Sequence, residues 1–486
     1  MKVRSLKHNF IMYFIRIFSG FGFTICIFPY VARILGAEAI GKIQYVETIV
    51  GYFLLFINFG IASFGKREVA LQRDDKNNLS NLISELLTIL LVTTCIGSIG
   101  YFMFIQLFIH DFVNKRLFYI YFVNIILNIF GVEWFYLGIE NQTYITKRNI
   151  CIKIISACFI FLFVKNKNNL FVYVWIMLLA TVGSNIYNFM NLKNYVILGV
   201  KSFVQVAKHL KRLLYIFFSS IATTIYYSID SIMIGNMIGD TELGYYTLVL
   251  KFGKIPLAIG TIVTGILSPR LTNLLGQNKV DKYRKLWEVG RDLIYLFYIP
   301  VAVGMFLLAQ PIILILGGKS FMPAIVMFKI FSLYIITMGI AVLTGISLDN
   351  FRKDKEYSLS VILGAILNVV INVFLIRKIG AVGAIIATIA TELLAVIVRI
   401  ALCGDIFKKI KLVDFNVLKL IIASILMGVA VFHVEKLINN IFLKVGISTI
   451  IGALVYTVIL LLLKERLTWM VIEKLKSKVQ LLVTSK

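Results

Sequence analysis

Cations that lie inside long apolar stretches are the residues of this sequence best placed to do chemistry. They are Arg16, Lys251, Lys254 and Lys329. A charge at the centre of a bilayer costs at least about 2.5–3.5 kcal/mol, so such groups normally face a helix-bundle interior or a water-filled path. Because a path lined by cations attracts anions, and lysine binds phosphate as a point charge, we take these four residues as candidate substrate-binding cations of a lumen.

Two acids, Asp230 and Glu392, lie in apolar stretches of the same kind. We take both as lumen acids that are candidates for coupling transport to an ion. Lys251 and Lys254 are three residues apart and share one helix face, and Pro256 is expected to bend the helix beside them. Asp230 is a candidate partner for one of these lysines, with simple helix–helix attachment as the alternative role.

Other polar residues point away from metal or nucleotide chemistry. Glu47, Lys153 and Arg399 lie near the ends of apolar stretches, where a side chain can reach the interface, so we set them aside. The four histidines are scattered and the five cysteines form no CxxC pair, so we expect no metal site and no cofactor. There is no Walker loop and no paired catalytic carboxylate. We therefore expect a transporter, not an enzyme.

The elements that must position these residues are membrane-spanning helices. The apolar fraction is 59% and the mean hydropathy is +0.90, far above the balance of a soluble protein. Stretches of about 20 apolar residues are long enough to cross a bilayer as helices. We predict about fourteen spans, at 10–28, 44–64, 82–109, 117–138, 148–165, 170–190, 213–238, 243–268, 292–316, 321–347, 357–376, 381–403, 417–434 and 445–463.

The net charge of +26 follows an alternating pattern along the chain. When the predicted loops are numbered alternately from the N-terminus, one set holds about three times as many lysines and arginines as the other. Cations collect in cytoplasmic loops of membrane proteins, so we predict that both termini are cytoplasmic. The same rule accounts for the basic charge without a nucleic-acid partner.

A repeated glycine turn relates the two parts of the chain. Gly36 and Gly41 frame a turn after the first span, and Gly239 and Gly244 frame a similar turn after the seventh. Six spans separate the two turns, so both point the same way, as in transporters built from parallel repeats. We predict two six-helix lobes plus two C-terminal helices, with domains at 1–205 (spans 1–6), 206–410 (spans 7–12) and 411–486 (spans 13–14 and an amphipathic tail).

Three amphipathic segments are predicted to lie on the cytoplasmic membrane surface. They are the connector after Leu192 that runs to Arg212, the segment from Val280 to Arg291, and the tail around Leu475. The alternative for each segment is a solvated basic loop.

Several motifs together resemble the bacterial polysaccharide-biosynthesis flippases, which translocate O-antigen and capsule repeat units. This family belongs to the multidrug/oligosaccharidyl-lipid/polysaccharide exporter superfamily. The motifs cover essentially the whole chain and are mostly structural turns, so they indicate the superfamily better than the substrate. They are Phe28-Pro-Tyr-Val-Ala-Arg-Ile-Leu-Gly36, Gly60-Ile-Ala-Ser-Phe-Gly-Lys-Arg-Glu68, Asp230-Ser-Ile-Met-Ile-Gly235, Gly244-Tyr-Tyr and Gly380-Ala-Val-Gly-Ala384.

The resemblance implies a substrate and a location. It implies that the chain flips an undecaprenyl-pyrophosphate-linked glycan from the cytoplasmic to the outer leaflet of the bacterial inner membrane, by alternating access through a cationic lumen. It also implies contact with membrane lipid and with other polysaccharide-assembly proteins. Of the motif residues, only Asp230 and the turn glycines carry over as positions.

Three alternatives stay open at this point. A cation-coupled multidrug exporter and a peptidoglycan-precursor flippase belong to the same superfamily, although a basic interior argues against the first. A membrane polysaccharide polymerase or ligase would need a long outer loop. The longest predicted outer segment, about 29–43, is short for that role.

Overall fold

Helices account for all regular structure that the computed structural model of this chain describes, which covers residues 5–199, 203–408, 410–470 and 473. Contacts divide the chain into two units, Met1–Gly244 and Tyr245–Lys486. This division follows contacts alone, and the domain boundaries expected from the repeat stay a prediction.

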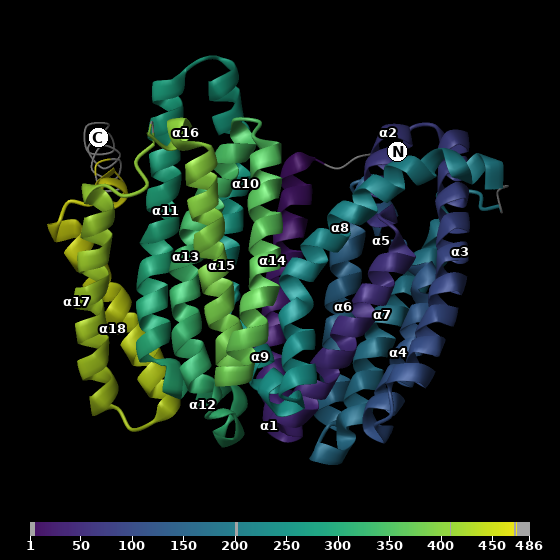
Figure 1. Cartoon of the computed structure of the whole chain (residues 1–486), viewed down its shortest axis with the longest axis horizontal. Helices are drawn as coiled ribbons and strands as arrows, with labels where there is room; N and C mark the ends of the chain where they lie inside the picture. Colours follow the sequence, from purple (N-terminus) through teal and green to yellow (C-terminus); the bar gives the residue numbers. More distant parts are fainter. Residues whose placement is uncertain (1–4, 200–202, 409, 471–472, 474–486) are drawn as a thin grey trace, which may run out of the picture. The chain divides into compact units, whose positions relative to one another are not determined.

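Among the described residues, eight α-helices lie wholly within the first unit and follow one another in chain order (Figure 1). Within it, α1 packs against α3, α4, α6 and α8, and α6 packs against α7. The helices are α1 (Leu6–Asn58), α2 (Ile61–Gln72), α3 (Lys76–Phe108), α4 (Phe112–Leu127), α5 (Glu133–Gly138), α6 (Gln142–Phe163), α7 (Leu170–Leu192) and α8 (Phe203–Met237).

The boundary after Gly244 falls within α9 (Asp240–Gly253), and the helices that follow it belong to the second unit. There α13 packs between α11 and α15, and α17 forms an antiparallel hairpin with α18 (Figure 1). These helices are α10 (Ala258–Gly276), α11 (Val280–Leu307), α12 (Ala309–Gly317), α13 (Ala324–Asn350), α14 (Asp354–Ile379), α15 (Ala381–Leu402), α16 (Gly404–Lys408), α17 (Phe415–Leu437) and α18 (Ile441–Leu462).

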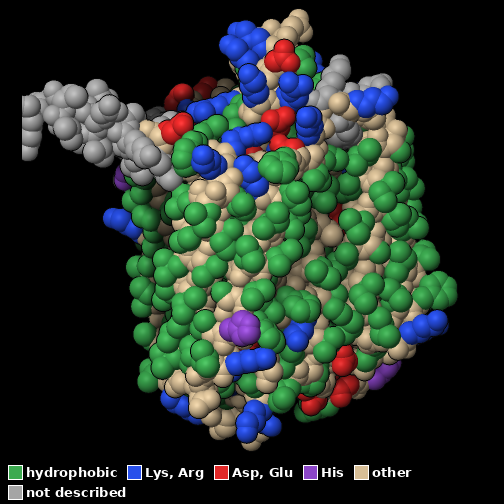
Figure 2. Space-filling model, turned by 90° about the vertical axis from the view of Figure 1, so that its left-hand side faces the viewer, with side chains coloured by type: hydrophobic (Ala, Val, Ile, Leu, Met, Phe, Trp, Pro, Cys, Tyr) green, Lys and Arg blue, Asp and Glu red, His purple; other side chains and the backbone are tan. Residues whose placement is uncertain are grey.

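The membrane character predicted from hydropathy is confirmed. Among the described residues, ten helical stretches are long and apolar enough to cross a membrane. Figure 2 shows an apolar band on the face that includes α17 and α18, with charged side chains gathered mostly at its upper end. The count of fourteen spans stays a prediction, because α4, α6 and α8 are not among the ten and α1 is counted once.

The first helix corrects one predicted loop. The segment 29–43 was expected to be an outer loop between two spans, but α1 continues through it and departs from helical geometry only at Gly36, with φ 83°. At 1.5 Å per residue, its 53 residues extend for about 80 Å, far more than the roughly 30 Å core of a bilayer. The break at Gly36 therefore divides α1 into two stretches, each long enough to span the membrane.

The two glycine turns pack against each other within the first unit. Gly36 and Gly239 both have positive φ, of 83° and 114°. An ideal Cβ on Gly41 would lie 1.7 Å from the carbonyl oxygen of Asp240, and one on Gly244 would lie 1.9 Å from the carbonyl oxygen of Ala37. The backbone of each turn thus occupies the space that a side chain on the other turn's glycine would need. Two related repeats would produce such a reciprocal contact.

The connector before the seventh predicted span is helical from Phe203, where it forms the first part of the 35-residue helix α8 and continues into that span. Its place on the membrane surface stays a prediction. Glu85 of α3, which is buried, accepts hydrogen bonds from Lys208 Nζ and His209 Nε2, both at 2.8 Å. The connector is therefore attached to α3 by its polar residues.

The segment 280–291 likewise forms the start of α11, where Tyr283 and Trp287 are buried. The third amphipathic segment, the tail around Leu475, lies outside the described residues.

A buried network of charges joins α11 to the entry of α17 and to the chain after α18. Arg291 Nη2 lies 2.7 Å from Asp292 Oδ1 and 2.6 Å from Asp414 Oδ2, and Arg291 also donates to the carbonyl oxygen of Lys411. Arg466 Nη1 contacts Glu288 Oε2 at 3.2 Å, and its Nη2 reaches Asp414 Oδ2 at 3.4 Å. Arg291 and Asp292 are 0% exposed, although Arg291 was expected in a cytoplasmic loop.

The glycine contact predicts unequal effects for the same substitution at two positions of α1. Gly41→Ala should destabilise the protein by about 1–3 kcal/mol, because the new Cβ meets backbone that cannot yield easily. Gly51→Ala should be neutral or stabilising, because nothing lies within 4 Å of its Cβ position. Thermal unfolding of both variants in detergent checks this, and equal melting temperatures would contradict the tight contact.

The charge network predicts a loss of stability in acid. Burial alone would raise the pKa of the Asp414 carboxyl, but hydrogen bonds from Arg291 and from the Val417 amide, with the charge of Arg466, hold that pKa below its usual value. In the unfolded chain the Asp414 carboxyl has its usual pKa, about 4. Just below this pH the unfolded chain therefore binds more protons than the folded one. The contribution of Asp414 to the free energy of unfolding is thus fully present above about pH 4, and it is lost as the pH falls through the pKa of this carboxyl in the folded protein.

Melting temperatures between pH 6 and pH 3 measure this effect. The wild type should lose more stability below pH 4 than Asp414→Asn, which should be less stable at pH 6. Asp281→Asn is the matched control, because the Asp281 side chain is 89% exposed and should not alter the profile. An Asp414→Asn profile parallel to that of the wild type would contradict the assignment.

Candidate anion-binding site

A cluster of cations shares one carboxylate between α1 and α6. Arg16 of α1 contacts Glu133 with Nη1 3.3 Å from Oε1, and Arg148 of α6 contacts the same carboxylate with Nη2 2.5 Å from Oε2. The Arg16 and Arg148 side chains are 16% and 4% exposed. We call Arg16, Glu133, Arg148 and Lys153 the basic cluster.

Lys153 joins the cluster from α6. Its Nζ lies 3.3 Å from the position that a Cβ on Gly20 would occupy, one turn of α1 beyond Arg16. It is close enough to Arg16 for the two charges to repel each other. Three cations therefore accompany one carboxylate, and the cluster carries an excess of positive charge in an apolar bundle. An anion entering it would relieve that repulsion.

Local sequence explains how Glu133 reaches both arginines. α4 ends at Leu127, and a short 3-10 turn, η1 (Asn128–Phe130), precedes the six-residue helix α5. Glu133 is the first residue of α5, where a carboxylate is favoured by the helix dipole. The interruption of the predicted span 117–138 thus presents the carboxylate to α1 and α6.

The predicted lumen cations have different surroundings. Arg16 belongs to the basic cluster. Lys251 lies on α9 and Lys254 directly after its end, and both are exposed. Lys329 of α13 is half-buried, with Nζ 5.5 Å from the centre of the Phe306 ring. At Pro256, where a bend was predicted, the α-helix is interrupted: α9 ends at Gly253, and Pro256 lies in a 3-10 turn before α10.

The predicted lumen acids are both buried. Asp230 of α8 is 6% exposed and Glu392 of α15 is 5% exposed. Arg16 and Asp230 belong to the first unit, whereas the three lysines and Glu392 belong to the second. That all six residues line one lumen stays a prediction.

Sequence reasoning missed Arg399, Arg148 and Glu133, of which the first two are buried and Glu133 is partly exposed, and the first of them corrects an explicit expectation. Arg399 was expected to reach the interface, but it is 5% exposed and donates to Ser360 Oγ and the Ala341 carbonyl, both at 2.9 Å. Arg148, at the start of the predicted span 148–165, and Glu133, inside the predicted span 117–138, were not among the candidates. For Glu133 the signal was present, because an acid in an apolar stretch requires a partner.

These features define a class: a multi-pass helical membrane protein with buried charges along its helices, as in transporters. Comparison with known families makes the assignment specific. Residues 6–275, more than half of the chain, match the family described as polysaccharide biosynthesis protein, and residues 216–375 match the MatE family. The chain belongs to the polysaccharide biosynthesis protein family, which confirms the resemblance found in the sequence.

Curated relatives share low identity over long or partial alignments. The chain is 22% identical to the "Putative O-antigen transporter" of Escherichia coli strain K12, over 80% of this chain and 94% of that protein. It is 23% identical to the "Probable low-salt glycan biosynthesis flippase Agl15" of Haloferax volcanii, over 50% of this chain and 52% of that protein.

Solved structures with the same fold include a flippase and a transporter. The lipid II flippase MurJ, in an inward closed conformation, gives a TM-score of 0.70 at 17% identity, covering 93% of this chain and 97% of that one. A multidrug resistance MATE family transporter in an inward-facing conformation gives 0.59 at 11% identity, covering 82% and 98%. These similarities establish the fold.

The basic cluster predicts unequal costs for removing two carboxylates. Glu133→Gln leaves the buried Arg148 guanidinium without its counter-ion. Because the Glu133 side chain is itself 39% exposed, the cost is about 1–3 kcal/mol, that of a buried donor left unsatisfied, and not that of a fully buried pair. Glu140→Gln is the matched control: Glu140 pairs with Arg73 at 2.8 Å, but the Arg73 side chain is 25% exposed, so the cost is about 0–1 kcal/mol. Thermal unfolding should show the larger loss for Glu133→Gln, and Arg148→Met should restore part of it. Equal losses in the two single variants would contradict the cluster.

Proposed function

We propose that this protein flips a polyprenyl-pyrophosphate-linked oligosaccharide, such as an O-antigen or capsule repeat unit, from the cytoplasmic to the outer leaflet. The observation that carries this proposal is the basic cluster, in which Arg16 and Arg148 share one carboxylate and Lys153 lies near Arg16. A pyrophosphate supplies the negative charge that the cluster lacks. Membership of the polysaccharide biosynthesis protein family supports a glycan as the rest of the cargo.

The proposed mechanism is alternating access through a cationic lumen between two lobes. In it, Arg16, Lys251, Lys254 and Lys329 bind the pyrophosphate, and Asp230 and Glu392 balance these charges or couple transport to an ion. The 3-10 turn at Pro256 supports this role for Lys251 and Lys254, because a break in the helix beside both lysines is a point at which they can move.

The proposed setting is the bacterial cytoplasmic membrane, with both termini cytoplasmic as the loop charges indicate. The partners are the lipid-linked glycan, membrane lipid and other polysaccharide-assembly proteins. No catalytic step is needed for this role, since translocation makes and breaks no covalent bond.

A peptidoglycan-precursor flippase is the second candidate. A specific observation favours it, because the solved lipid II flippase shares the fold over nearly the whole chain. Its cargo is also an anionic lipid, so the basic cluster suits both. Multidrug export is less well supported, since a cationic cargo would be repelled by Arg16, Arg148 and Lys153.

The paired lysines provide the test. In proteoliposomes holding a fluorescent polyprenyl-pyrophosphate oligosaccharide, Lys251→Gln with Lys254→Gln should reduce flipping at least about tenfold, the effect of losing about 1.4 kcal/mol of anion binding. Arginine at both positions should restore part of the activity because it restores the charge. Lys165→Gln with Lys167→Gln is the control, since both lysines are exposed near the short turn that begins at Lys167 and should not affect flipping.

Full flipping by the Lys251/Lys254 double variant at normal protein level would refute an anion site at these lysines. Asp230→Asn distinguishes the two roles of that acid. It should have a small effect if Asp230 only balances a lysine, and an effect as large as the double variant if it couples an ion.

A further inference from the structure

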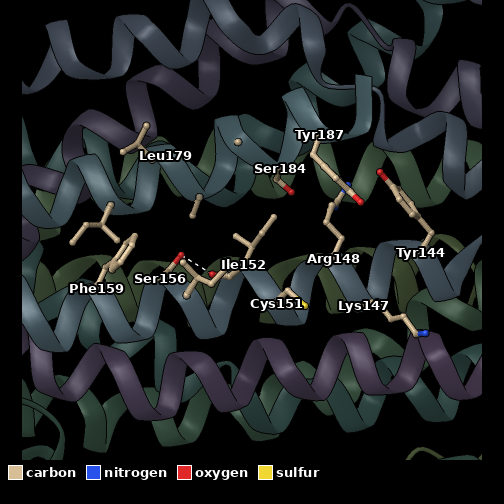
Figure 3. A pocket seen from close by; sticks show the side chains of 14 residues that line it. Tyr144, Lys147, Arg148, Cys151, Ile152, Ser156, Phe159, Leu179, Ser184 and Tyr187 are labelled. Atoms are coloured by element: carbon tan, nitrogen blue, oxygen red, sulfur yellow. Dashed lines mark hydrogen bonds between the residues drawn. The ribbon is translucent and has the colours of Figure 1, made fainter. Parts of the chain in front are cut away.

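A groove between α6 and α7 has the shape and charge of a lipid-binding site. Its volume is about 630 Å³, within the range of about 300–1,000 Å³ that is common for ligand pockets. Figure 3 shows Tyr144, Arg148 and Tyr187 at one end and Phe159 and Leu179 at the other. The groove lies entirely within the first unit.

The two helices line the groove with faces of different character. α6 contributes Ile152, Ile155 and Phe159 at helical spacing. α7 contributes the small residues Ala180, Gly183 and Ser184, which leave room along the groove. The long apolar section therefore suits a hydrocarbon chain.

The other end of the groove is basic. Lys147 and Arg148 are among the lining residues, and the lining contains no acid. Arg148 is 7% exposed, and its Nη1 has no hydrogen-bond partner among the described residues. A buried donor without an acceptor costs about 1–3 kcal/mol, so a phosphate oxygen at this end would provide the missing acceptor. The groove therefore joins an apolar channel to a guanidinium that is paired with Glu133 through Nη2 but has a donor at Nη1 that the described residues leave free.

We infer that this groove holds one acyl chain of an anionic membrane phospholipid, with the headgroup phosphate at Lys147 and Arg148. From Arg148 to Phe159 the groove follows eleven residues of α6, or about 16 Å at 1.5 Å per residue. That length matches the roughly 15 Å hydrocarbon thickness of one leaflet, which fits a phospholipid chain better than a long polyprenyl chain.

The orientation of the site agrees with this occupant. The basic end is at the start of α6, which the loop charges place on the cytoplasmic side. Anionic phospholipids are concentrated in the cytoplasmic leaflet, and basic pockets between helices on that side bind their headgroups. The inference goes beyond the proposed flipping activity. It rests on the proposed orientation, and it shares Arg148 with the basic cluster.

The test measures lipid binding to the purified full-length protein. Phosphatidylglycerol should co-purify with the wild type and should raise its melting temperature more than phosphatidylcholine with the same chains. Lys147→Gln should weaken phosphatidylglycerol binding about fivefold, which corresponds to about 1 kcal/mol. Inorganic phosphate alone should give no shift, because it lacks the chain.

Matched glycine variants test the apolar part of the groove. A Cβ added at Gly183 meets nothing within 4 Å, so Gly183→Leu fills the channel without disturbing the fold and should reduce bound phosphatidylglycerol about tenfold. Gly100→Leu on α3 is the control, because its Cβ position is equally open and lies outside the groove. Flipping by the Lys251/Lys254 variants is measured separately, so failure of one proposal does not decide the other.

Three results would overturn the inference. Equal binding of phosphatidylcholine and phosphatidylglycerol would show that Lys147 and Arg148 do not select an anionic headgroup. Equal lipid retention by Gly183→Leu and Gly100→Leu would show that the acyl chain does not bind in this groove. Protection by a polyprenyl phosphate but not by phosphatidylglycerol would make the groove part of the substrate path instead.

Discussion

The close contact between the two glycine turns constrains the rest of the first unit. Backbone meets backbone at Gly41 and Gly244, with no space for a side chain on either. This contact fixes where α1 changes direction and where α8 gives way to α9. Tyr45 then packs on Gly235 and donates a hydrogen bond to Asn236 at 2.6 Å, so the helices that leave the turns are also joined by side chains.

Buried charge is the second constraint, and the protein meets it differently in its two units. In the second unit Arg291 is surrounded by acceptors and lies in a network with two aspartates, which makes it a structural element. In the first unit Arg16 and Arg148 share a single carboxylate, and Lys153 adds a further cation. A saturated network holds helices together, whereas an unsaturated one retains affinity for an anion. This difference is why we place function at the second kind of cluster.

Hydropathy predicted the helical membrane fold well because long apolar stretches have few other stable structures. The glycine spacing also indicated two related turns, and Pro256 indicated the break after α9. The surroundings of single charges could not be predicted. Arg399 lies near a span end, and its burial depends on Ser360 and Ala341, which are 39 and 58 residues away in sequence. Glu133 reaches two arginines only because α4 stops early, an interruption that hydropathy does not reveal.

The continuity of α8 has a mechanical consequence. Its 35 residues contain no proline, so no proline interrupts the backbone hydrogen bonds between its two ends. One end is attached to α3 through Glu85, and the other leads directly into the turn at Gly239. The Glu85 contact and the glycine turn are therefore two fixed points on one continuous backbone. Any displacement at one of them would be carried to the other along the helix, without side-chain rearrangements in between.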